Sequence, residues 1–130
     1  MYLTNAQSAS ASAAAWPMSR RSARSSQAEA EALWAFVKYI VSEAERTGVP
    51  GASGSCLKLY YTELKQRVGE LSMRVLGRAA LCREDVAGLP SEEFVFQAFQ
   101  SLSMTIAAGS SQIQRNIISE RILGLPKERR

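Results

Sequence analysis

The segment formed by residues 105–126 constrains the fold of this chain most, because it contains a break between two helices and the end of the second. Apolar helical spacing stops at Gly109, and Ser110 and Ser111 then supply hydroxyls of the kind that often begin a helix. A new apolar run follows at helical spacing: Ile113, Ile117, Ile118 and Ile122. Because Gly124 ends this run as a glycine after a helix does, the sequence predicts two helices joined by a sharp turn at Gly109.

The start of the second of these helices has two interpretations. Ser111 and Gln114 have the spacing of a capping box, in which a hydroxyl and a side-chain amide satisfy backbone N–H groups reciprocally. The same N–H groups and the positive end of the helix dipole could also face an anion. The spacing alone favours the plain cap over the anion site.

Apolar residues at helical spacing predict three further helices upstream. The first begins near Ser26, the second follows Ser55 and ends at Gly77, and the third opens at Ser91. Their predicted buried stripes are Leu33, Phe36, Val37, Ile40, Val41 and Ala44 in the first, Leu57, Tyr61, Leu64, Val68, Leu71 and Val75 in the second, and Val95, Ala98, Phe99, Leu102 and Ile106 in the third.

Four helices with short links and no strand pattern predict an all-α fold, a four-helix bundle of up-down antiparallel helices. The links include a glycine-rich loop after the first helix, and a connector at residues 78–90 with a short helical turn at most. Phe94 and Phe96 point away from the third stripe, so we expect an exposed aromatic surface that marks an interface.

Composition excludes several classes of site and partner. The chain has no histidine, which removes Ser–His and Cys–His nucleophile pairs and imidazole metal ligands. Cys56 and Cys82 lack metal-ligand spacing, so no metal site is predicted and both are expected to be reduced thiols. No apolar run approaches the roughly 20 residues of a membrane span. The net charge of +4 comes from the two ends of the chain, and the near-neutral body predicts no nucleic-acid partner.

The chain divides by composition into three parts. Residues 1–26 form an Ala/Ser/Arg-rich leader that we expect to be disordered, residues 27–126 form the helical domain, and residues 127–130 form a basic tail. The acid-poor leader also resembles a mitochondrial transit peptide. The low-complexity run from Ser8 to Ala15 has no arginine on an amphipathic face, however, and this favours a cytoplasmic location.

One resemblance is specific. The stretch GSSQIQRNII, which begins at Gly109, and the stretch ERILGLP, which begins at Glu120, closely resemble the C-terminal signature of flavin-dependent acyl-CoA dehydrogenases. The preceding helix of that family's C-terminal domain is matched by Lys58, Leu59, Thr62, Glu63, Leu64, Gln66, Arg67, Glu70 and Leu71. The resemblance covers roughly residues 27 to 126.

This resemblance implies a cofactor and partners. In the family, the loop that matches Gly109, Ser110, Ser111 and Gln112 contacts flavin adenine dinucleotide (FAD), and the last helices form subunit contacts. By resemblance, then, these four residues bind FAD together with missing domains or a partner subunit. The chain is expected to form a homo- or hetero-oligomer through its helices, and the complete enzyme to act on an acyl-CoA substrate. Arg115 is expected to brace this loop or a neighbouring subunit.

Two departures from the family pattern matter. Many relatives carry the catalytic glutamate where this chain has Ala108, and alanine cannot accept a proton, so no catalytic residue is assigned. Relatives also add a helical and a β domain in front, and a compact subgroup includes enzymes of steroid side-chain degradation. The chain is therefore interpreted as the C-terminal part of a dehydrogenase that is inactive alone. The alternative is a catalytically silent helical oligomerisation module that no longer binds flavin.

Overall fold

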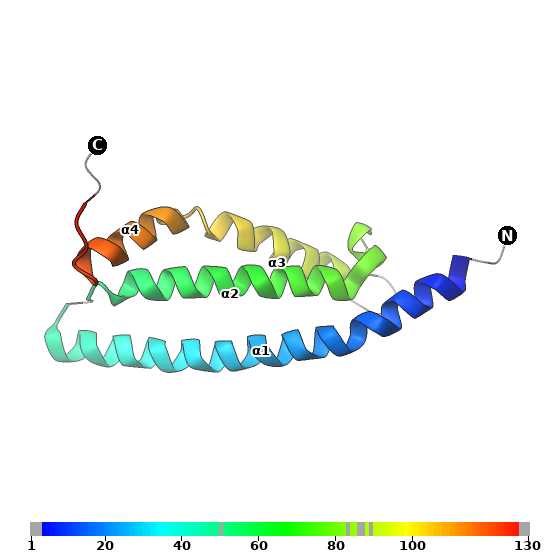
Figure 1. Cartoon of the computed structure of the whole chain (residues 1–130), viewed down its shortest axis with the longest axis horizontal. Helices are drawn as coiled ribbons and strands as arrows, with labels where there is room; N and C mark the ends of the chain where they lie inside the picture. The colour runs from blue at the N-terminus through cyan, green and yellow to red at the C-terminus, as the bar shows by residue number, and fades with distance from the viewer. Residues whose placement is uncertain (1–3, 50, 83, 86–87, 89, 128–130) are drawn as a thin grey trace.

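The computed structural model describes residues 4–49, 51–82, 84–85, 88 and 90–127, with the backbone alone for residues 4–19. Within these ranges the chain is helical and contains no strand, so the all-α prediction is confirmed. The elements in order are α1 (Thr4–Thr47), α2 (Ser53–Leu76), the short 3-10 helix η1 (Gly77–Leu81), α3 (Ser91–Met104) and α4 (Ser111–Arg121) (Figure 1).

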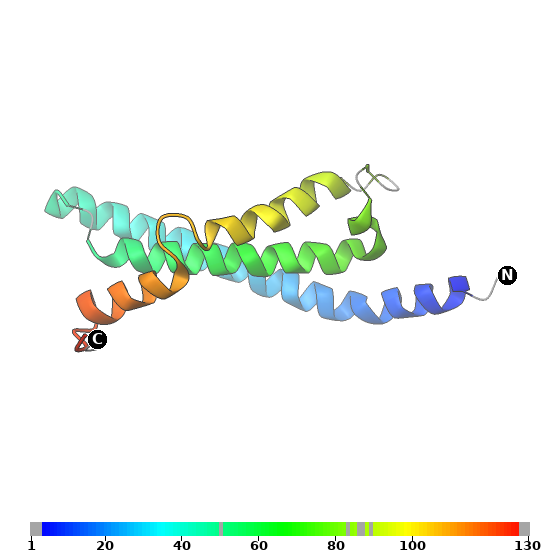
Figure 2. The same ribbon diagram turned by 90° about the horizontal axis from the view of Figure 1, so that it is seen from above.

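Helix α2 is the centre of the arrangement. It packs against α1, α3 and α4, whereas in the described part of the chain α1 packs against neither α3 nor α4. Both views show α1, α3 and α4 running antiparallel to α2, so the prediction of four helices packed antiparallel is confirmed, with α3 and α4 parallel to one another (Figures 1 and 2). Among the α-helices, each outer helix therefore contacts α2 alone, and α3 also contacts the short helix η1.

The segment between α3 and α4, residues 105–110, crosses over α2 and is named the crossing loop below. Figure 2 shows α3 on one side of α2 and α4 on the other, with both helices running in the same direction along it. The predicted turn is present, since Gly109 has a positive φ of 94°. The two helices it joins do not form a hairpin, however, because the crossing loop carries the chain across α2 before α4 begins.

The core is small and partly polar. Only Leu64 and Leu76, 5% and 7% exposed, are buried apolar residues among those described. Thr62, Ser91, Ser101 and Gln114 are buried as well. At the contact of α2 with α3, Gly69 allows close approach, since a Cβ there would lie 3.0 Å from the Ala98 Cα.

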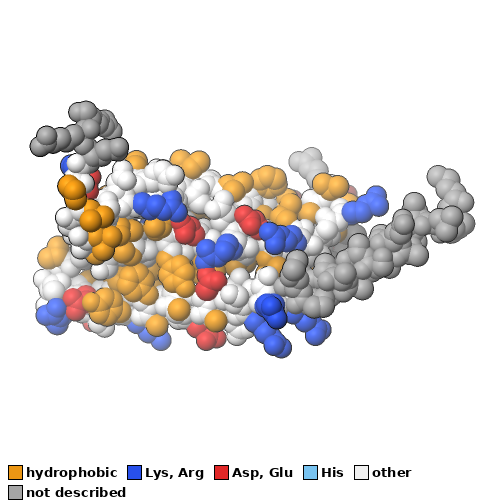
Figure 3. All heavy atoms as spheres, in the orientation of Figure 1, with side chains coloured by type: hydrophobic (Ala, Val, Ile, Leu, Met, Phe, Trp, Pro, Cys, Tyr) orange, Lys and Arg blue, Asp and Glu red, His pale blue; other side chains and the backbone are white. Residues whose placement is uncertain are grey.

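Much of the apolar surface predicted to be buried is exposed. Phe99 is 63% exposed and Ile106 is 72% exposed, and further members of the predicted stripes are also exposed: Val41, Tyr61, Val68, Val75 and Leu102. These predictions were wrong because α1, α3 and α4 each pack against α2 but not against one another, so the bundle does not close around a shared core. The prediction that Phe94 and Phe96 are exposed is confirmed. Figure 3 shows the resulting hydrophobic side chains spread over one face of the molecule.

Helix boundaries were predicted unevenly. The predicted start of α3 at Ser91 and the predicted end of α2 at Gly77 are confirmed. The start predicted at Ser26 is wrong, because α1 begins at Thr4 and residues 4–26, predicted to be a disordered leader, are helical. Seven alanines lie between Thr4 and Ser26, and alanine has the highest intrinsic helix propensity. Helix α2 begins at Ser53 without a side-chain cap, so the predicted cap at Ser55 is also wrong.

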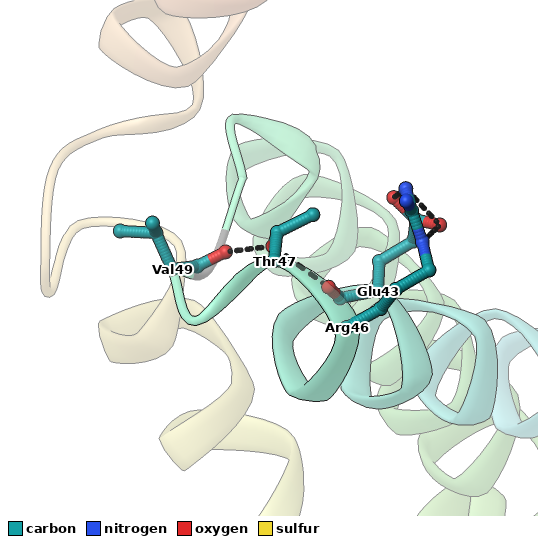
Figure 4. A network of polar contacts seen from close by, with 4 residues as sticks. All are labelled: Glu43, Arg46, Thr47 and Val49. Carbon is teal, nitrogen blue, oxygen red and sulfur yellow. Dashed lines mark hydrogen bonds and ion pairs between the residues drawn. The ribbon is translucent and has the colours of Figure 1, made fainter.

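The end of α1 is stabilised by side chains of its own last turns (Figure 4). The Thr47 hydroxyl lies 2.7 Å from the Glu43 carbonyl oxygen and 3.0 Å from that of Val49. The Arg46 guanidinium pairs with the Glu43 carboxylate at 3.2 Å. Gly48 then adopts a positive φ of 74°, which ends the helix as the sequence predicts.

Candidate functional site

The crossing loop has an unusual backbone at its end. Ala108 has a φ of 55°, which makes it the one described residue other than glycine with a positive φ, and Gly109 follows with a φ of 94°. The left-handed conformation costs an L-residue such as alanine roughly 1–2 kcal/mol. The rest of the chain therefore has to hold the loop in this shape.

Lys58 of α2 binds the crossing loop through its ammonium group. Its ammonium donates hydrogen bonds to the carbonyl oxygens of Gly109, at 2.7 Å, and of Thr105, at 3.4 Å. The side chain is half-buried, and the hydroxyl of the buried Thr62 donates to the Lys58 carbonyl at 3.0 Å. Lys58 was part of the sequence resemblance, but no role was inferred for it. The sign in the sequence that could have indicated a role for Lys58 is that this charged residue directly follows Leu57, an apolar position of the predicted stripe.

Gln114 of α4 binds the same loop through its side-chain amide. Its side-chain Nε2 donates to the Ala108 carbonyl at 2.8 Å, and the residue is 7% exposed. Its Oε1 is buried and has no hydrogen-bond partner among the described residues. A Cβ on Gly109 would lie 3.0 Å from Gln114 Nε2, so the close approach requires glycine.

The cap of α4 is Ser110. Its Oγ accepts a hydrogen bond from the backbone N–H of Ile113 at 3.4 Å, and its backbone is extended. The predicted capping box of Ser111 with Gln114 is therefore wrong. The physical reason is that Gln114 is engaged with Ala108, while the Ser111 N–H donates to the Thr105 carbonyl at 3.2 Å.

Arg115 braces the start of α4, as predicted. Its Nη1 donates to Gln112 Oε1 at 2.7 Å, and its Nη2 forms an ion pair with Glu63 of α2. In the sequence, Glu63 is only one of the residues that match the family, and its pairing with Arg115 is not predicted. Because this pair joins residues 52 positions apart, the sequence carried no direct sign of it.

An open depression of about 370 Å³ lies beside this brace. Its lining residues come from α2, the crossing loop and the first turns of α4: Glu63, Gln66, Thr105, Ile106, Ser110, Ser111, Gln112 and Arg115. Three of the four predicted cofactor-binding residues, Ser110, Ser111 and Gln112, thus share one depression. Gly109 does not line it.

Several hydrogen-bond donors at this depression are unused. Within the described ranges, the Ser111 hydroxyl, the Gln112 side-chain Nε2 and the Gln112 backbone N–H have no acceptor. Such donors at the N-terminus of a helix suit phosphate, ribose or carbonyl oxygens. Glu63 and Arg115 neutralise one another, so neither brings net charge to the depression.

The comparisons with known proteins agree with this architecture. A family described as "Acyl-CoA dehydrogenase, C-terminal domain" matches residues 1–123 of the chain. The chain belongs to the acyl-CoA dehydrogenase family. This confirms the resemblance found in the sequence. The family is flavin-dependent, and no solved structure matches this acyl-CoA dehydrogenase domain significantly.

Curated relatives of this acyl-CoA dehydrogenase domain come from mycobacteria. Acyl-CoA dehydrogenase IpdE1 of Mycolicibacterium smegmatis is 41% identical over 76 residues, which cover 55% of this chain and 17% of the relative. IpdE1 of Mycobacterium tuberculosis is 40% identical over 76 residues, covering 55% of this chain and 18% of the relative. Acyl-CoA dehydrogenase FadE26 of Mycobacterium tuberculosis is 34% identical over 84 residues, covering 64% and 21%. The chain thus spans about a fifth or less of each of these relatives.

The described part of this acyl-CoA dehydrogenase domain shows neither a metal cluster nor a membrane-spanning helix. Among the residues that the structure describes, no group of three or more histidine, cysteine, aspartate or glutamate side chains could hold a metal ion. No described helix has both the length and the apolar character required to cross a membrane. Cys56 is half-buried and Cys82 is exposed, and both are free thiols.

Proposed function

We propose that this chain is the FAD-contacting and oligomerising C-terminal part of an acyl-CoA dehydrogenase. The complete enzyme would introduce a double bond between the α and β carbons of an acyl-CoA thioester. When bound, FAD supplies the hydride acceptor for that reaction. The observation that carries the proposal is the set of unused donors at Ser111 and Gln112, in the first turn of α4 and directly after a loop that is bound by Lys58 and Gln114.

The cofactor-binding residues proposed are Gly109, Ser110, Ser111 and Gln112. The Ser111 hydroxyl and the Gln112 amide can donate to oxygen atoms of FAD without breaking any bond within the described protein. Ser110 accepts from Ile113 through its oxygen, so its hydroxyl hydrogen is also available to an acceptor. Gly109 contributes its backbone. The donor set therefore fits a flavin nucleotide.

The catalytic base is not assigned to this chain. Ala108 stands where many relatives have the catalytic glutamate, and its methyl group cannot remove the α-proton of the substrate. Glu63, the carboxylate nearest in the depression, is paired with Arg115. We propose that the base and most of the acyl-CoA cleft are supplied by other parts of the enzyme, and that this chain alone is inactive.

Oligomerisation is proposed from the uncovered apolar surface. Phe94, Phe96 and Phe99 of α3 are exposed, and the outward faces of α1 and α4 also carry exposed apolar residues. Contiguous exposed apolar surface of this kind marks an interaction site on a soluble protein. The other domains of the enzyme or further copies of this chain would cover it.

A catalytically silent helical module is the second candidate. Ala108 favours it, because the chain lacks a proton acceptor at that position. The retained donors at Ser111 and Gln112 favour the flavin-linked function instead, since a bundle used only for association would not need them.

The deciding experiment measures native mass and flavin absorbance for the chain alone and for the chain co-expressed with the coding sequence upstream of it. The proposal expects a flavin-free oligomer alone and a yellow complex after co-expression. Absence of both flavin and complex in the co-expressed sample would instead favour the silent module.

A further inference from the structure

We infer that Lys58 is a positioning residue for the crossing loop, acting with Gln114 to keep two consecutive backbone N–H groups, those of Gly109 and Ser110, free for a ligand. This inference rests on the proposed function and concerns residues outside the four assigned to FAD. Lys58 would not itself touch the cofactor. Its role would be to fix the orientation of the peptide groups on either side of Gly109.

The orientation follows from peptide geometry. The described chain contains no cis peptide bond, and in a trans peptide the C=O and the following N–H point in opposite directions. The Ala108 carbonyl is bound by Gln114, so the Gly109 N–H points away from Gln114. The Gly109 carbonyl is bound by Lys58, so the Ser110 N–H points away from the Lys58 ammonium.

Neither of these N–H groups donates a hydrogen bond to another described residue. No acceptor for the Gly109 N–H or the Ser110 N–H exists in the described part of the chain. The N–H of Gln112, in the first turn of α4, is unused as well, whereas the Ser111 N–H donates to the Thr105 carbonyl. Consecutive free N–H groups, as at Gly109 and Ser110, can form concave sites for anionic oxygens, such as those of a nucleotide phosphate.

Lys58 is specialised for this role among the lysines of α2. Its aliphatic stem lines an apolar depression with Leu33 and Val37 of α1, and its ammonium reaches two loop carbonyls. Lys65, two turns further along, bonds to the Gln100 side chain and to the Met104 sulfur instead. Lys65 therefore contacts α3 but no backbone atom of the crossing loop.

The first test uses the 130-residue chain without cofactor and follows the backbone amide resonances of Gly109 and Ser110 by NMR. Lys58→Met keeps most of the stem and removes the donors, so both resonances should shift. Lys58→Arg should restore them toward the wild-type positions, and Lys65→Met should leave them in place. Unchanged resonances in Lys58→Met, or equal shifts in Lys65→Met, would overturn the inference.

The second test uses the co-expressed complex and measures the dissociation constant of FAD. Lys58→Met should raise it about tenfold, because the loop loses about one hydrogen bond that holds it in the binding shape and must be ordered when FAD binds, whereas Lys65→Met should not change it. Ser111→Ala tests the proposed function separately. If Ser111→Ala weakens FAD binding and Lys58→Met does not, the positioning role fails while the function stands. If the wild-type complex binds no FAD, both fail.

Discussion

Arg115 of α4 forms an ion pair with Glu63 of α2, and the same guanidinium donates to Gln112 at 2.7 Å. One side chain therefore links the first turn of α4, which carries the proposed cofactor donors, to the central helix of the bundle. Together with Lys58 and Gln114, it fixes the loop and the helix start on a rigid support.

Glu63→Gln tests the stabilising effect of this ion pair. Both side chains are partly exposed, so the loss in free energy of unfolding should stay below about 1 kcal/mol. Urea unfolding measures this loss, and Glu70→Gln is a matched control because its pair with Arg74 lies within α2 at 3.7 Å. A loss of several kcal/mol for Glu63→Gln would mean that the pair is part of the core.

Ser110→Ala should destabilise the chain and Ser111→Ala should not. Only Ser110 accepts a hydrogen bond from an N–H of the first turn of α4, and removing such a cap costs about 0.5–1 kcal/mol. Urea unfolding of the two variants distinguishes the adjacent serines. Equal losses in the free energy of unfolding for the two variants would instead support the capping box of Ser111 predicted from the sequence.

Ala108→Gly should stabilise the chain slightly. Glycine removes a left-handed strain of roughly 1–2 kcal/mol but adds about 0.4–1 kcal/mol of entropy to the unfolded state. A net gain near ~0.5 kcal/mol in the free energy of unfolding is expected. The control is Ala107→Gly, whose φ is not positive, and which should therefore lower stability. Stability losses of the same size in both variants would contradict the strain at residue 108.

Gly109→Ala should destabilise the chain by about 1–2 kcal/mol. Its φ of 94° disfavours any side chain, and the added Cβ would lie 3.0 Å from Gln114 Nε2. Thermal unfolding compares it with Gly51→Ala, where no atom lies within 4 Å of the added carbon and no positive φ is required. If the two variants unfold at the same temperature, the crossing loop is not held in the described shape.

The sequence predicted local features better than contacts between helices. Gly77 and Ser91 mark helix boundaries through their own conformational preferences, so both were read correctly. The exposure of Phe99 could not be predicted in this way, because burial depends on which helices meet. The contact of Lys58 with Gly109 spans 51 positions and depends on the path of the crossing loop over α2.

The residues proposed to contact the cofactor could be predicted from the sequence because Ser110, Ser111 and Gln112 belong to a specific signature. The choice of Ser110 over Ser111 as the cap depends on the backbone torsions of Ala108 and Gly109. A strained alanine before the glycine gives no sign in the sequence, so the cap was assigned one residue too late.

The last prediction concerns the exposed apolar surface of α3. Phe99 is 63% exposed, so Phe99→Ser should lower the free energy of unfolding of the monomer by less than about 1 kcal/mol, whereas truncating a buried phenylalanine costs about 3–5 kcal/mol. The same substitution should weaken self-association, or association with other domains, because it replaces apolar interface area with a hydroxyl. Sedimentation velocity at several concentrations measures association, and urea unfolding measures stability.

Leu64→Ala is the matched control, because Leu64 is 5% exposed and lies in the core on α2. It should cost about 2–5 kcal/mol of stability. At concentrations where Leu64→Ala remains folded, its association should equal that of the wild type. If Phe99→Ser instead unfolds the monomer as strongly as Leu64→Ala and leaves association unchanged, then Phe99 packs within the chain and α3 is not the interface.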